Sequence, residues 1–117
     1  MIRIDNLSKN YGSVEAVKSI SFSLGDGEIV GFLGANGAGK STTLKIMTGY
    51  LTPTSGNVYV GDKNIIDDCL EIQRSVGYLP ELNPLYSEMK VHEYLKFHAA
   101  IRGIEGTDFT NALKKVV

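Results

Sequence analysis

The sequence predicts an α/β fold, and three consecutive stretches carry that prediction. Residues 19–24 alternate polar and apolar side chains, the two-residue period of a strand buried on one face. Residues 29–33 are apolar without alternation, which favours a strand buried on both faces, as in a parallel sheet. Residues 40–48 then show helical spacing, and Gly49 is placed to end that helix.

Further strands and helices are expected before and after these three stretches. Alternation and short apolar stretches predict strands over residues 2–7, 57–60 and 76–79. Helical patterns cover residues 67–75, a stretch from Val91 to about residue 101, and 108–117. Lys90 is a poor N-cap, so the helix from Val91 is expected to begin raggedly. The last helical pattern stops without a Gly or Asn, which favours a truncated domain.

The composition narrows the class of protein. The chain has 117 residues, enough for one domain or part of a larger one. Twelve Lys and Arg against 13 Asp and Glu leave a net charge of -1, without the basic footprint of a nucleic-acid binder. Cys69 is the only cysteine, which excludes an internal disulfide. The N-terminus lacks a signal-peptide pattern and no apolar run approaches ~20 residues, so a cytoplasmic location is expected.

A phosphate-binding motif, Gly-Ala-Asn-Gly-Ala-Gly-Lys-Ser, occupies residues 34–41. Its glycines let successive main-chain N–H groups turn toward phosphates, and the helix N-terminus adds free donors and partial positive charge. We expect Lys40 to meet the β- and γ-phosphates, Ser41 to bind Mg²⁺ and Thr42 to meet the α-phosphate. The alternative is an ordinary glycine turn with a solvated lysine, but the motif follows a strand pattern and opens a helix. The expected nucleotide-binding residues here are Gly34, Asn36, Gly37, Ala38, Gly39, Lys40, Ser41 and Thr42.

The sequence around this loop resembles the ATP-binding domain of ABC transporters. The matching stretches are residues 7–12, 16–22, 27–34, 41–45, 51–58 and 76–81. The resemblance covers nearly the whole chain in family order and implies an α/β fold with a partial P-loop NTPase core. It implies an antiparallel β region over residues 1–30, the P-loop core over 29–81 and the start of a helical subdomain over 82–117. Residues 1–117 are thus expected to be the N-terminal portion of one ATP-binding domain.

Two further site residues follow from the resemblance. Tyr11 matches the aromatic residue that stacks on adenine, although without the resemblance a half-buried loop tyrosine would be the favoured interpretation. Glu81 stands where most of the family has glutamine, beside Mg²⁺ and the γ-phosphate. A carboxylate still offers oxygen to a hard cation, so Glu81 is expected to be a metal ligand and, with Lys40, a catalytic residue. The alternative for Glu81 is a solvated loop carboxylate.

Glu81 and its neighbours also resemble one branch of the family. The stretch Tyr-Leu-Pro-Glu over residues 78–81, followed by Asn-Pro-Leu-Tyr over 83–86, is similar to ATP-binding domains of ABC-2-type, multidrug and gliding-motility exporters. The family's Ser-Gly-Gly signature, its Walker B acids and its switch histidine have no match in this sequence. The chain alone is therefore expected to bind ATP without hydrolysing it.

The resemblance implies the ATP-binding subunit of a transporter. That subunit would use ATP and Mg²⁺, pair with a second ATP-binding domain as a homodimer in the full-length protein, and drive a separate transmembrane subunit. It would lie peripherally on the cytoplasmic face of the membrane, contacting the membrane only through that partner and binding no nucleic acid. One alternative is a non-transport ABC-type ATPase of regulatory or translation type. A small-molecule P-loop kinase fits less well, because its phosphate loop would lie almost at the N-terminus.

Overall fold

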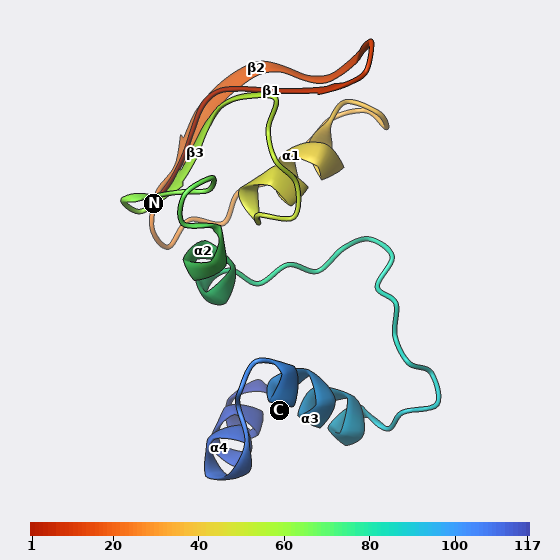
Figure 1. Ribbon diagram of the computed structural model, residues 1–117. Coiled ribbons are helices and arrows are strands. Elements are labelled where there is room, and N and C mark those ends of the chain that lie inside the picture. Colours follow the sequence, from red (N-terminus) through yellow and green to blue (C-terminus); the bar gives the residue numbers. More distant parts are fainter. The chain divides into compact units, whose positions relative to one another are not determined.

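An antiparallel sheet with strand order β2-β1-β3-β4 dominates the N-terminal part of the chain (Figure 1). A computed structural model describes all residues, 1–117. The strands are β1 (Ile2–Tyr11), β2 (Val14–Leu24), β3 (Ser55–Val60) and β4 (Lys63–Asn64). The expected strands at 2–7, 19–24 and 57–60 are confirmed, and β1 and β2 are longer than their alternating patterns indicated. β1 lies between β2 and β3 and pairs antiparallel with both.

The chain divides into two units, Met1–Tyr78 and Leu79–Val117. The first holds the sheet with helices α1 (Lys40–Met47) and α2 (Cys69–Ser75). The second holds α3 (Val91–Ile101) and α4 (Gly106–Val116). None of these helices combines the length and the apolar composition that crossing a bilayer requires.

The inner face of the sheet packs against α1. Ile4 and Leu7 are both buried although they lie three residues apart, because β1 is irregular between them and Asn6 adopts a positive φ of 48°. The extra residue returns Leu7 to the face already used by Ile4. Ile46 of α1 packs against this face and is completely buried. The full buried apolar cluster consists of Ile4, Leu7, Val17, Ile46, Val58, Ile65 and Ile72.

The apolar segment 29–33 is not a strand, so that expectation was wrong. No residue of the segment pairs with a strand, and Ile29 and Leu33 are fully or almost fully exposed. A strand inside a parallel sheet needs neighbours that bond to both of its edges, and nothing in this chain supplies them. Residues 76–79, another expected strand, likewise do not form a strand.

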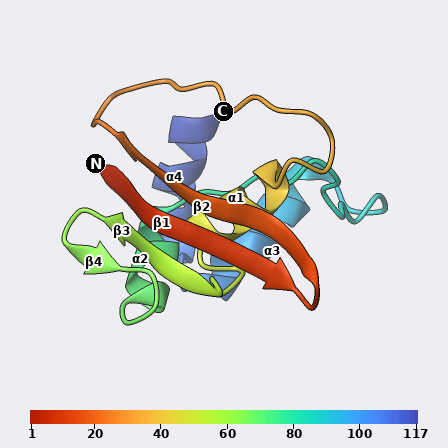
Figure 2. The ribbon, with the colours of Figure 1, turned by 90° about the horizontal axis from the view of Figure 1, so that it is seen from above.

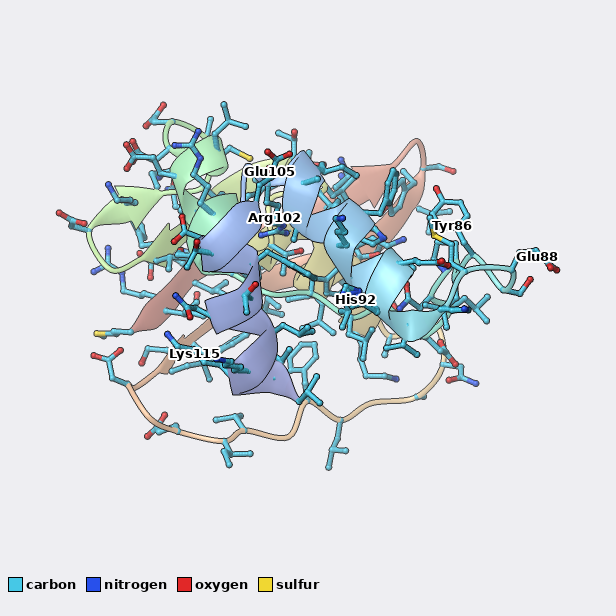
Figure 3. All side chains as sticks on the ribbon, turned by 90° about the horizontal axis from the view of Figure 1, so that it is seen from below. Tyr86, Glu88, His92, Arg102, Glu105 and Lys115 are labelled. Atoms are coloured by element: carbon cyan, nitrogen blue, oxygen red, sulfur yellow. The ribbon has the colours of Figure 1, made fainter.

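The second unit is a pair of short helices (Figure 3). The rings of His92 on α3 and Phe109 on α4 form a T-shaped pair, with ring centroids 5.5 Å apart. The helix α3 begins cleanly at Val91, contrary to the expected ragged start. The carboxylate of Glu93 accepts a hydrogen bond of 3.0 Å from the main-chain N–H of Lys90, which satisfies one free donor at the helix start.

An ion pair joins β4 to α2 in the first unit. The ammonium of Lys63 donates a hydrogen bond to the carboxylate of Glu71. That hydrogen bond, and then the opposite charge, hold the pKa of Glu71 below its ordinary value and raise the pKa of Lys63. The pKa of Glu71 is lower in the folded state than in the unfolded state. The ion pair therefore contributes fully to stability at pH values above the unfolded-state pKa of Glu71. It is lost as the pH falls through the folded-state pKa.

Replacing Lys63 with alanine is expected to raise the pKa of Glu71 toward its ordinary value. The variant loses both the hydrogen bond and most of the neighbouring positive charge, leaving Arg74 as the weaker cation. An NMR titration that follows the Glu71 side-chain carboxyl measures the change. The matched control is Lys18→Ala, which removes an exposed lysine that has no ion pair. An unchanged Glu71 pKa in Lys63→Ala would show that the pair does not form.

Candidate nucleotide-binding site

The glycine loop, residues 34–39, leads directly into α1, as the motif predicts. The N–H of Ala38 donates to the carbonyl of Ala35 at 3.1 Å and closes a turn within the loop. Gly37 and Gly39 have φ angles of 81° and 89°, in the left-handed region that side chains disfavour. Gly39 is also the N-cap of α1. The backbone of the loop therefore needs glycine at these two positions.

Gly39 holds the end of the loop against strand β2. A Cβ atom at Gly39 would lie 2.3 Å from the carbonyl oxygen of Ala16 and 3.2 Å from a methyl group of Val17. The first contact is with backbone, which cannot swing aside. Only a residue without a side chain permits this approach, so the position of the loop relative to β2 depends on Gly39.

Free main-chain donors gather where the loop meets α1. The first helical hydrogen bond runs from the N–H of Thr43 to the carbonyl of Gly39, at 2.9 Å, and the Thr43 hydroxyl also donates to this carbonyl at 2.8 Å. Ahead of Thr43, several main-chain N–H groups have no acceptor. They belong to Asn36, Gly37, Gly39, Lys40, Ser41 and Thr42. Such a set of donors at a helix N-terminus is suited to binding an anion.

Lys40 adds a positive charge to these donors. Its ammonium donates hydrogen bonds to the carbonyl oxygens of Gly34 and Ala35, the second at 2.8 Å. The ammonium therefore lies back over the loop, attached to oxygens that carry no full charge. A phosphate oxygen, which does carry charge, makes a stronger acceptor than either carbonyl. The arrangement is one in which Lys40 can transfer its hydrogen bonds to an anion held in the loop.

Ser41 is the one expected metal ligand in the first unit. Its side chain is exposed at the first turn of α1 and its hydroxyl makes no hydrogen bond. No cluster of three or more His, Cys, Asp or Glu side chains is arranged to hold a metal ion. Mg²⁺ commonly takes few protein ligands and completes its shell with water and substrate phosphates. The residues present thus fit a Mg²⁺ ion that arrives with a nucleotide, and they do not form a metal site by themselves.

A hollow of about 680 Å³ lies between the loop and strand β2. From the loop side it is lined by Gly37, Ala38 and Lys40, and from the strand by residues 15–18. Sequence reasoning did not find this β2 stretch, because its nearness to the loop depends on the Gly39 contact. Only the pairing of β1 with β2, which the sequence does not show, could have indicated that this stretch lies beside the loop.

Tyr11 does not line that hollow, but it lies close along the same hairpin. It ends β1 and pairs with Val14, two residues before Ala16 on β2. From strand geometry, the level of Tyr11 along the strands is about 7 Å from that of Ala16. Its side chain is 48% exposed, with the Lys9 ammonium 5.5 Å from the ring centroid. The ring is thus exposed enough for a stacking contact, and its role at adenine stays a prediction.

Glu81 belongs to the second unit. It lies in an irregular segment before α3, with an exposed side chain that makes no hydrogen bond. Its assignment to the metal remains a prediction from the sequence.

Comparisons with known proteins indicate the family of the chain. The family model described as "ABC transporter" matches residues 17–117. The ABC transporter ATP-binding protein YxlF of Bacillus subtilis is 40% identical over 104 residues, covering 89% of this chain and 34% of its own length. The linearmycin resistance ATP-binding protein LnrL, also of Bacillus subtilis, is 39% identical over 104 residues, covering 89% and 33%.

Solved structures give the same result. The dimeric structure of MJ0796, a bacterial ABC transporter cassette, matches with a TM-score of 0.80 and 28% identity. The match covers 97% of this chain and 55% of that one. The chain spans between 5% and 34% of the first curated relatives that it matches. With the phosphate loop, the antiparallel sheet and these matches together, the chain belongs to the ABC transporter family, as part of one of its ATP-binding domains.

Proposed function

We propose that this chain is the nucleotide-binding part of a transport ATPase. The observation that carries the proposal is the set of free main-chain donors around the start of α1, completed by the Lys40 ammonium. The MJ0796 cassette, which has this fold, has been solved in a post-hydrolysis state with ADP and Pi. A nucleoside triphosphate offers such donors a chain of charged oxygens as acceptors. An ordinary glycine turn has no need of so many unpaired donors.

Each site residue then has a separate task. The loop amides of residues 34–39 hold the phosphates and Lys40 neutralises their charge. Thr42 meets the α-phosphate, and Tyr11 stacks on adenine. Ser41 and Glu81 would hold Mg²⁺, which when bound would neutralise negative charge on the phosphates. Lys40 and Glu81 are the proposed catalytic residues of this chain.

The whole protein is proposed to couple ATP hydrolysis to transport through a transmembrane subunit. YxlF is named as an ABC transporter ATP-binding protein, and LnrL as a linearmycin resistance protein, which agrees with the exporter branch. MJ0796 forms a dimer, which supports a homodimer of ATP-binding domains. Residues 1–30 would form the β region, 29–81 the nucleotide core and 82–117 the helical arm. The assembly would lie on the cytoplasmic face of the membrane, bound through its partner.

Replacing Lys40 with alanine is expected to weaken MgATP binding by about tenfold or more, since a charge-assisted hydrogen bond to phosphate is lost. Titration of the chain with a fluorescent ATP analogue in the presence of Mg²⁺ measures the affinity. Lys45→Ala is the matched control, because it removes a lysine from the last turn of the same helix. Equal affinities for wild type and Lys40→Ala would remove the loop from the nucleotide site and, with it, the proposed function.

A further inference from the structure

The segment between α1 and β3 is bound at both of its ends. The main-chain N–H groups of Tyr50 and Leu51 both donate to the carbonyl of Lys45 in the last turn of α1, at 2.8 and 3.2 Å. The N–H of Thr54 donates to the carbonyl of Ser8 on β1, at 2.9 Å. Figure 2 shows β3 starting beside the C-terminal end of β1, where this segment arrives. The segment therefore ties the helix that carries the free N–H groups to the C-terminal end of β1.

Two side chains complete this attachment next to Tyr11. The Thr54 hydroxyl accepts a hydrogen bond from the main-chain N–H of Asn10, at 2.9 Å. The ammonium of Lys9 donates to the carbonyl of Thr52, at 2.8 Å. Since Asn10 directly precedes Tyr11, these bonds hold the backbone immediately before the tyrosine.

Lys9 also contacts the Tyr11 ring itself. Its ammonium lies over the ring, 5.5 Å from the centroid, within the range of a cation–π attraction. No carboxylate forms an ion pair with this ammonium. Lys9 is half-buried, whereas the Tyr11 side chain is exposed. An anchored lysine thus restrains a ring that solvent can still reach.

We propose that Lys9 is a positioning residue for base stacking by Tyr11. This role rests on the proposed function, in which the ring stacks on adenine. A side chain that becomes ordered only on binding lowers affinity by about two- to tenfold, and Lys9 orders the ring before the nucleotide arrives. Because Lys9 acts on the ring, its effect is confined to ligands that carry a base. Lys40 acts on the phosphates and affects ligands with or without a base.

Isothermal titration calorimetry of the whole chain tests the proposal, with MgATP as one ligand and inorganic triphosphate with Mg²⁺ as the other. Lys9→Met keeps an unbranched side chain but removes the charge. It should weaken MgATP binding by about two- to tenfold and leave triphosphate binding unchanged. Lys9→Arg should bind MgATP as the wild type does, because a guanidinium also donates to carbonyls and lies over aromatic rings. The matched control is Lys45→Met, at an exposed lysine in the last turn of α1, which should change neither affinity.

A second pair of variants tests whether Lys9 acts through the ring. Tyr11→Ala should weaken MgATP binding by about tenfold, since it removes the stacking surface. Adding Lys9→Met to Tyr11→Ala should cause no further loss, because the ring on which Lys9 acts is gone. A purely structural role of Lys9 would weaken binding in both backgrounds and for both ligands.

The outcomes separate this proposal from the proposed function. Unchanged MgATP affinity in Lys9→Met overturns the positioning role, and so does an equal loss of triphosphate affinity or a further loss in the Tyr11→Ala background. The phosphate site would stand in each of these cases. If Tyr11→Ala leaves MgATP affinity unchanged, the adenine assignment fails and the role of Lys9 fails with it. If the wild type binds neither ligand, the proposed function fails as a whole.

Discussion

Gly39→Ala is expected to abolish detectable nucleotide binding and to destabilise the first unit. The substitution forces a side chain into a φ of 89°, which alone costs about 1–3 kcal/mol. It also places a methyl group 2.3 Å from the carbonyl oxygen of Ala16, so the loop must move away from β2. That movement displaces the helix start together with its free N–H groups. Urea unfolding and titration with a fluorescent ATP analogue measure the two effects.

Gly37→Ala is the matched control for this prediction. Gly37 lies in the same loop with a similar φ of 81°, but a Cβ there meets nothing within 4 Å. The control should lose about 1–2 kcal/mol through backbone strain alone and keep the loop beside β2. Equal losses of stability in the two variants would mean that the Gly39–Ala16 contact contributes nothing, and that the loop is placed by other means.

Local patterns predicted the elements whose partners lie nearby in sequence. The alternation that ends at Leu24 is confirmed, since Ile20, Phe22 and Leu24 are the less exposed residues of that stretch. Gly49 ends α1 as expected: the N–H of Gly49 donates to Ile46 and that of Tyr50 to Lys45, at 3.0 and 2.8 Å. These features depend on side-chain period and on turn chemistry, which a short window of sequence contains.

Features that depend on distant partners could not be predicted in this way. The segment 29–33 has the composition of a buried strand, but pairing requires another strand, and the composition does not say whether one is present. The irregularity at Asn6 changes which residues of β1 face inward without any glycine to mark it. The approach of Gly39 to Ala16 joins residues 23 positions apart in the sequence. The motif therefore identified the loop, but not the β2 stretch beside it.

Ile46→Ala is expected to lower the free energy of unfolding of the first unit by about 2–5 kcal/mol. Ile46 is fully buried and joins α1 to the inner face of the sheet, where only seven apolar residues form the buried cluster. Since small domains are stabilised by about 5–15 kcal/mol in total, this single loss is a large share of the stability. Thermal unfolding followed by circular dichroism measures it.

The matched control for Ile46→Ala is Ile66→Ala, which removes the same atoms from a side chain that is 54% exposed. The control should change the free energy of unfolding by no more than about 0.5 kcal/mol. Because α1 carries Lys40, Ser41 and the free N–H groups, nucleotide affinity should fall together with stability in Ile46→Ala and not in Ile66→Ala. A folded Ile46→Ala chain with unchanged affinity would show that the loop holds its shape without the packing of α1 on the sheet. In that case the position of the phosphate site depends on Gly39 alone.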